Sequence, residues 1–104
     1  MKKLLALLIT ACCALHSTIF IAGQNDLDQA TLWITDSAGT LIKTTPLDNP
    51  YSRALNCITA GSEVYICGFN SNGNPSLWIT DLFGIPKPPI VLSDQGDAAL
   101  AMIA

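Results

Sequence analysis

Short apolar runs alternate with polar turns along most of the chain. Residues 31–35 and 40–44 are rich in β-branched side chains and flank the turn sequence Asp36-Ser37-Ala38-Gly39, which predicts a β-hairpin. A second hairpin is expected from residues 64–69 and 76–80, because Asn72-Gly73 between them is the strongest short-range hairpin signal. Further short strands are expected over residues 54–59, 90–92 and 98–104. After Gly23 no stretch has a convincing helical period, so the pattern predicts an all-β class.

A repeated pentapeptide indicates that these strands belong to two similar units. Leu32-Trp33-Ile34-Thr35-Asp36 recurs unchanged as Leu77-Trp78-Ile79-Thr80-Asp81, 45 residues further on. At this offset, ten of the 28 positions from Leu32 to Thr59 are identical. Repeat one is placed at residues 32–76 and a partial repeat two at residues 77–104. Asp and Gly three residues apart are turn residues, and Leu, Ile and Trp suit a buried strand. A repeated ligand-stacking site using Trp33 and Trp78 is the alternative.

The repeat resembles a known class. An apolar strand over residues 64–69 that ends in Gly68-Phe69, an Asn72-Gly73 turn and a strand bearing Trp78 look like the repeats of bacterial secreted β-propellers. The resemblance covers residues 32–104, about one and a half repeats, and it implies antiparallel hairpins in a meander of two propeller-blade-like units. It implies nothing about a ligand, and the Gly-His and Trp-Asp signatures of the WD class are absent.

The first 23 residues read as a secretory signal. Lys2 and Lys3 precede an apolar run over residues 4–15, the layout of a signal peptide, which predicts a helix here and export to the periplasm or the medium. Cleavage is expected after Gly23, which leaves a β-repeat domain at residues 24–104; Ala14 is the other candidate position. Two alternatives attach the protein to a membrane: lipidation of Cys12, or an uncleaved anchor, because residues 4–22 approach the length that spans a bilayer.

Charge and composition limit the kinds of function expected for the chain. The formal net charge is -3, which disfavours binding to nucleic-acid phosphates. The single histidine, His16, lies in the leader, so the mature chain lacks the usual general base and the commonest metal ligand. The acidic residues are scattered over turns. The sequence therefore predicts no enzyme, no cofactor and no metal site.

Cys57 and Cys67 would be the two cysteines of the mature chain, and an exported protein meets an oxidising compartment. Whether they can form a disulfide depends on the register between the strands expected at residues 54–59 and 64–69. If Ala60 pairs with Val64 the cysteines lie opposite one another, whereas a two-residue turn puts them on opposite faces. The alternative to a disulfide is a pair of buried thiols that pack as small hydrophobes.

The second repeat ends at Ala104, opposite Thr59, without a counterpart of residues 64–69. Stacked repeats bury their faces against neighbours, so we expect self-association or pairing with a longer repeat protein through open sheet edges. The function expected from sequence is therefore a noncatalytic exported β-repeat protein with a binding role. The alternatives are an extracytoplasmic carbohydrate-binding module and a small membrane-attached envelope protein.

Overall fold

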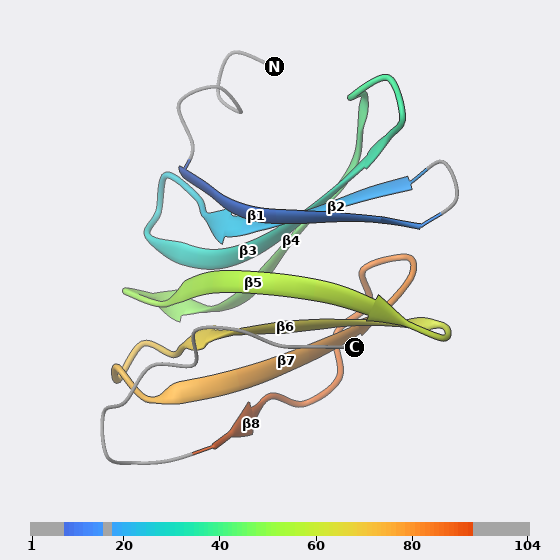
Figure 1. The fold of residues 1–104 in the computed structure, drawn as a ribbon. Coiled ribbons are helices and arrows are strands. Elements are labelled where there is room, and N and C mark those ends of the chain that lie inside the picture. The colour runs from blue at the N-terminus through green and yellow to red at the C-terminus, as the bar shows by residue number, and fades with distance from the viewer. Residues whose placement is uncertain (1–7, 16–17, 93–104) are drawn as a thin grey trace.

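The computed structural model describes residues 8–15 and 18–92, and within these ranges the chain is all-β. Two four-stranded antiparallel sheets lie one above the other, each with its strands in chain order (Figure 1). Sheet 1 consists of β1 (Leu8–Leu15), β2 (Thr18–Gln24), β3 (Gln29–Asp36) and β4 (Leu41–Pro50). Sheet 2 consists of β5 (Arg53–Ala60), β6 (Glu63–Phe69), β7 (Pro75–Asp81) and β8 (Ile90–Val91). No helix occurs in the described ranges, and the predicted all-β class is confirmed.

The 45-residue spacing governs the strand pairing. Each pair of residues that lie opposite one another in sheet 2 corresponds to a pair in sheet 1 whose residue numbers are lower by 45. For example, Trp33 pairs with Ile21 in sheet 1, and Trp78 pairs with Ile66 in sheet 2. Even the irregularities coincide, because β1 shifts register between Ile9 and Ala11 and β5 shifts it between Ala54 and Asn56. The structural unit is therefore a complete four-stranded meander that begins at residue 8, earlier than the repeat boundary placed at residue 32.

The predicted strands after residue 31 are confirmed wherever the structure describes them. The hairpins over 31–44 and 64–80 form β3–β4 and β6–β7, and the predicted strands at 54–59 and 90–92 correspond to β5 and β8. In the proline-rich segment after β7, Pro86 makes only an isolated bridge to Thr80, and β8, which follows it, is an edge strand. The strand predicted over residues 98–104 lies outside the described residues.

The signal helix expected in the N-terminal apolar run is not confirmed. A helix was expected there, but residues 8–15 and 18–24 form two strands, and β2 pairs with β3 along its whole length. The local sequence supports this, because Thr18, Ile19, Phe20 and Ile21 are β-branched or aromatic. Burial supports it as well: Phe20 is 1% exposed and Ala22 is fully buried.

Two kinds of turn recur with the sheets. Asn25 and Asn70 hold the β2–β3 and β6–β7 turns, and each side-chain oxygen accepts bonds from the backbone N–H groups two and four residues on. Asp36 and Asp81 do the same in the β3–β4 turn and the turn after β7. Gly39 and Gly84 take positive φ in these latter turns, at 85° and 81°. Identical side-chain chemistry thus closes equivalent turns.

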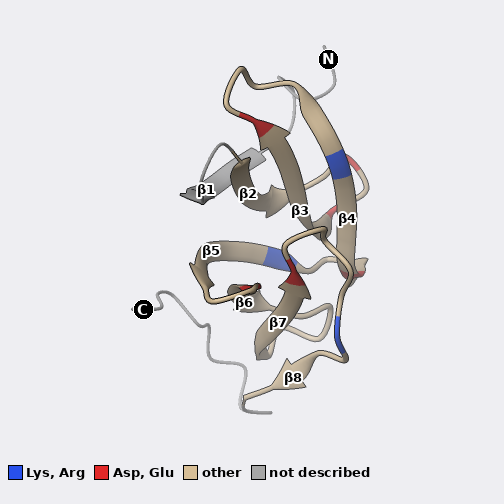
Figure 2. Ribbon diagram, turned by 90° about the vertical axis from the view of Figure 1, so that its right-hand side faces the viewer, with Lys and Arg blue, Asp and Glu red and all other residues tan. Residues whose placement is uncertain are grey.

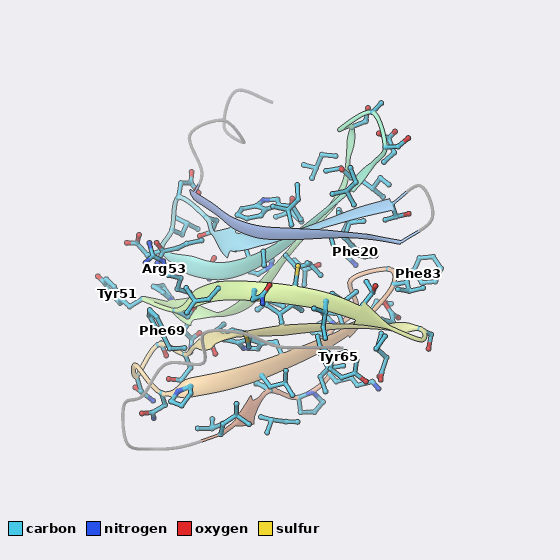
Figure 3. The ribbon with its side chains drawn as sticks, in the orientation of Figure 1. Phe20, Tyr51, Arg53, Tyr65, Phe69 and Phe83 are labelled. Atoms are coloured by element: carbon cyan, nitrogen blue, oxygen red, sulfur yellow. The ribbon has the colours of Figure 1, made fainter. Side chains whose placement is uncertain are left out.

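The hydrophobic core lies between the sheets. β5 packs against β1, β2 and β3, and Figure 1 shows it directly beneath them. Sheet 1 contributes Phe20, Ala22, Ala30, Leu32 and Ile34, and sheet 2 contributes Ala54, Cys57, Val64, Ile66 and Trp78. In Figure 3, Phe20 lies between the two sheets. The two units are therefore joined by a buried apolar interface.

Candidate functional site

Each sheet has two chemically distinct faces. We call the face that carries Trp33 in sheet 1 and Trp78 in sheet 2 the Trp face, and the opposite face, with Leu32 or Leu77, the Leu face. Register places Ile19 and Ile21 on the Trp face of sheet 1, and Val64 and Ile66 on that of sheet 2. The Leu faces carry Phe20 and Ile34 in sheet 1, and Tyr65 and Ile79 in sheet 2. Within the chain, the Leu face of sheet 1 packs against the Trp face of sheet 2.

The two tryptophans proposed for ligand stacking are buried. Trp33 and Trp78 occupy equivalent positions in β3 and β7, and both are 2% exposed. The Trp78 indole N–H donates to Asp48 Oδ2 in β4 at 3.2 Å, so its polar atom links the two sheets. A stacked sugar needs an open ring face, which neither indole offers in this structure. Their positions fit the structural interpretation of the repeat.

The register between β5 and β6 separates the two cysteines. Ala60 pairs with Glu63, so Cys57 lies opposite Ile66 and Cys67 lies opposite Asn56. This is the two-residue turn that puts the cysteines on opposite faces, and it does not support the candidate Cys57–Cys67 disulfide. Both side chains are buried, Cys57 toward Phe20, whose carbonyl lies 3.6 Å from its sulfur. Burial raises the pKa of the Cys67 thiol and keeps it protonated.

The turn after β7 reaches across to sheet 1. The Thr45 hydroxyl donates to the Gly84 carbonyl at 3.0 Å. A Cβ on Gly84 would lie 2.9 Å from Thr45 Oγ1 and 3.0 Å from Ile34 Cδ1, so a side chain there would require these side chains or the turn to shift. Glycine is therefore favoured at this position by close packing as well as by its positive φ.

Tyr51 and Ser52 form the two-residue connection between β4 and β5, which joins sheet 1 to sheet 2. Ser52 is fully buried between β4 and β5; its hydroxyl accepts a bond from Ala30 N at 2.8 Å and donates to Asn49 O at 2.7 Å. The Gln24 side chain donates to the Ser52 carbonyl at 3.0 Å. Tyr51 N donates to Asp28 O at 2.7 Å. The connection is thus held by the end of β2, the start of β3 and the turn between them.

One open groove of about 430 Å³ lies where the turn after β7 meets the end of sheet 1. Its wall is mostly apolar, with one ammonium group at its rim, and it is lined by Thr18, Ile34, Ile42, Lys43, Leu82 and Phe83. Phe83 is 75% exposed and lies at one end of the molecule, as Figure 3 shows. The groove can receive an apolar group, and Thr18 and Lys43 are the polar residues that line it.

Charged groups do not gather into a site on the part of the chain that the structure describes. Figure 2 shows basic and acidic segments dispersed over both sheets. No group of three or more His, Cys, Asp or Glu residues with metal-binding geometry occurs there. Lys87 and Glu63 form an exposed ion pair beside β6. Among these residues no helix is long and apolar enough to cross a membrane.

The sequence interpretation missed the N-terminal half of the repeat. The signal was present, because alignment at the same offset places Cys12 on Cys57, Ile21 on Ile66, Gly23 on Gly68 and Asn25 on Asn70. The basic start and the apolar run fit a signal peptide, and that interpretation removed these residues from the comparison. Their equivalents in β5 and β6 show the structural role that the matches encode.

Searches against protein families, curated proteins and solved structures returned no match to this chain.

Proposed function

We propose that this chain is a noncatalytic β-repeat protein, built of propeller-like four-stranded units, that acts by binding through its sheet faces. One observation carries the proposal: two sheets with the same internal pairing, 45 residues apart, stack with unlike faces together. Such stacking is the way in which repeat proteins build extended surfaces. The side chains repeated in the two units lie in strands, in turns and in the interface, which supports a structural role for the repeat.

Residues 8–24 belong to the folded protein in this proposal. Removing them would take away two strands of sheet 1, with the buried side chains of Phe20 and Ala22. Cleavage after Gly23 remains a prediction from the sequence that competes with this role. Under our proposal, export to the periplasm or the medium would have to leave these residues attached. Membrane attachment through residues 4–22 or a lipid on Cys12 would likewise compete with the pairing of β1 and β2.

Burial of both indoles favours this function over the carbohydrate-binding module. A sugar platform built on Trp33 and Trp78 would require sheet 1 and sheet 2 to separate, because Trp78 lies in the interface between them. Separation would break the bond from the Trp78 indole to Asp48. We therefore assign the repeated tryptophans to packing.

The stacked units can be tested with the tryptophans themselves, since the chain has only two. Trp33→Phe leaves a probe in sheet 2, and Trp78→Phe leaves a probe in sheet 1. If the sheets form one cooperative unit, fluorescence and far-UV circular dichroism should give coincident thermal transitions within each variant. Two separated transitions, one for each sheet, would contradict the proposal. Addition of oligosaccharides should leave the fluorescence of the unsubstituted chain unchanged.

A further inference from the structure

The Leu face of sheet 2 points away from sheet 1. The two sheets meet through the Leu face of sheet 1 and the Trp face of sheet 2, so none of the described strands lies over the Leu face of sheet 2. Register places on this outward face Tyr65 and Cys67 of β6, Leu77 and Ile79 of β7, and Ile90 of β8. The equivalents of these residues in sheet 1 are all buried, so each position can be compared with a covered one.

The apolar side chains on β7 and β8 are only partly covered. Leu32 and Ile34 in sheet 1 are 0% and 2% exposed, whereas their equivalents in β7, Leu77 and Ile79, are half-buried. Ile90 on the edge strand is 45% exposed. This side of the outward face therefore keeps apolar side chains in contact with water.

Cys67, on β6, differs from these neighbours. It lies between Asn56 of β5 and Leu77 of β7, and it is 2% exposed, almost as buried as its covered equivalent, Ala22. Sheet 1 cannot cover Cys67, because this side chain is on the face that points away from sheet 1. Its burial indicates that the outward face is covered over β6 and left open toward the edge strand.

The repeat points to a segment of the chain that fits this place. β5 is the strand of sheet 2 that packs against β1, β2 and β3, and it contributes Ala54 and Cys57 to the core between the sheets. At the 45-residue offset β5 corresponds to residues 98–104, which lie outside the described part of the chain. Ala54 and Cys57 correspond to Ala99 and Met102. Both positions that β5 directs toward sheet 1 are thus apolar in this segment.

We propose that residues 98–104 pack as a strand on the Leu face of sheet 2, over β5 and β6, as β5 packs on sheet 1. The inference deepens the proposed function and rests on it, because the segment becomes the first strand of a third unit stacked in the same way. Ala99 and Met102 then face sheet 2. A single strand covers one part of the face, which agrees with the burial of Cys67 and the exposure of Ile90.

The chemistry of the segment suits this face. Residues 98–104 contain no charged or polar side chain, so packing on sheet 2 removes apolar surface from water. Methionine is unbranched and adapts its shape to irregular gaps. The carboxylates at the border of the face, Glu63 and Asp81, already bind Lys87 and the backbone N–H groups of the turn after β7. No unpaired carboxylate therefore needs to be buried under the segment.

The connection is long enough for this path. Leu92 N donates to Pro75 O at 2.8 Å, which holds the chain beside β7. Two strand spacings and one layer spacing, each about 10 Å, separate β8 from a strand lying over β6, a path of roughly 14 Å. Residues 93–97 can span about 17 Å when extended. Pro75 takes the place of Ala30 and has no backbone N–H, so the bond from Ala30 N to Ser52 is not repeated and the contact depends on apolar packing.

Alkylation of Cys67 tests the proposal, because a thiol reacts only where the reagent reaches it. The unsubstituted chain is compared with a chain of residues 1–97 and with Met102→Lys, which places an ammonium group in the contact. Ala101→Lys is the matched control, since its equivalent in β5 points away from sheet 1. Native samples are treated with iodoacetamide and analysed by peptide mass spectrometry, and Cys57, in the core between the sheets, reports on folding in each sample.

We expect Cys67 to be protected in the unsubstituted chain and in Ala101→Lys, and to be modified in the shortened chain and in Met102→Lys while Cys57 stays protected. If the shortened chain fails to fold and loses protection at both cysteines, Met102→Lys decides, because it keeps the full length. Circular dichroism and the coincidence of the tryptophan transitions should be unchanged in Met102→Lys, since the contact lies on the outer face.

Protection of Cys67 in all four chains would overturn the proposal, and so would its modification in the unsubstituted chain or in Ala101→Lys. Loss of protection at both cysteines in Met102→Lys would show that the segment does not act on the outer face alone, and would also overturn it. Protection that disappears on dilution would assign the cover to a second copy of the chain instead. Any of these results with coincident tryptophan transitions overturns this inference alone, whereas separated transitions overturn the proposed function.

Discussion

Single residues explain why the two sheets share one irregular strand pairing. Gly68 lies opposite Ala54, at the point where β5 shifts register. A Cβ on Gly68 would overlap the backbone carbonyl of Arg53, and backbone cannot move aside as a flexible side chain can. Gly23 occupies the equivalent position opposite Ile9, beside the same shift in β1. Gly68 is therefore tied to a close approach between β5 and β6, and the equivalent glycine in sheet 1 lies beside the same register shift.

Gly68→Ala should lower the free energy of unfolding by about 1–3 kcal/mol or more, because the added methyl group must displace main chain. Ser62→Ala, at an exposed turn position, is the control and should change the free energy by less than about 0.5 kcal/mol. Urea unfolding followed by circular dichroism measures both. Equal stability of the two variants would mean that the strands do not approach closely at the bulge.

Cys67 should be protected from alkylation. Its side chain is 2% exposed, and burial raises the pKa of its thiol, so the folded chain holds little of the reactive thiolate at neutral pH. The unfolded thiol ionises at a lower pH than the folded one, so this group lowers the free energy of unfolding as pH rises through the thiol range. Peptide mass spectrometry after iodoacetamide treatment should find Cys67 modified in the denatured chain only.

A thiol introduced by Ser62→Cys, at an exposed position, serves as the reactive control in the same sample. Recovery of a Cys57–Cys67 crosslinked peptide under non-reducing conditions would contradict the β5–β6 register described above.

At the scale of elements, equivalent turns should contribute equally to stability. The Asn25 and Asn70 side chains each accept two backbone hydrogen bonds, all four between 2.9 and 3.0 Å. Asn25→Ala and Asn70→Ala should each cost about 1–3 kcal/mol, the range for leaving backbone donors without an acceptor. Thermal unfolding of the two variants, with the exposed Ser37→Ala as control, tests this. A loss for Asn70→Ala with none for Asn25→Ala would show that the β2–β3 turn is not part of the folded chain.

Local chemistry made most of these elements predictable. β3, β4, β6 and β7 were expected because β-branched runs flank turns whose Asp, Asn and Gly residues have a known preference for turn conformations. The same rules failed for β1 and β2, because an apolar run behind two lysines fits a leader as well as a strand. Composition alone does not distinguish a leader from a strand. In the structure the pairing of β2 with β3 distinguishes them, and strand pairing depends on contacts that a local sequence pattern does not contain.

The candidate site was less predictable than the strands. Repetition of Trp33 and Trp78 was visible in the sequence, but it could serve either a surface or a core. Burial of Trp78 follows from how the two sheets stack, which brings Phe20 and Trp78, 58 positions apart, into one core. The difference between covered and outward faces could not be predicted either, because Leu32 and Leu77 are identical in sequence and differ only in what lies over them.

At the scale of the whole molecule, the central claim is that residues 8–24 complete the first of two equivalent sheets. Their loss would leave β3 as an edge strand, with a row of unpaired backbone groups, and would uncover part of the core beneath Phe20. A fully buried Phe alone contributes about 1.5–3 kcal/mol, against a total stability of about 5–15 kcal/mol for an ordinary domain. The second unit also loses the strands β1 and β2 against which β5 packs.

Thermal unfolding of the full chain, compared with a chain of residues 24–104, tests this claim most directly. We predict a sharp cooperative transition for the full chain, with both indoles shielded from iodide quenching in the folded state. For residues 24–104 we predict a broad, non-cooperative transition with quenchable indoles. A transition for residues 24–104 as sharp and as high as that of the full chain, with both indoles shielded, would contradict the account and show that residues 8–24 are a dispensable leader.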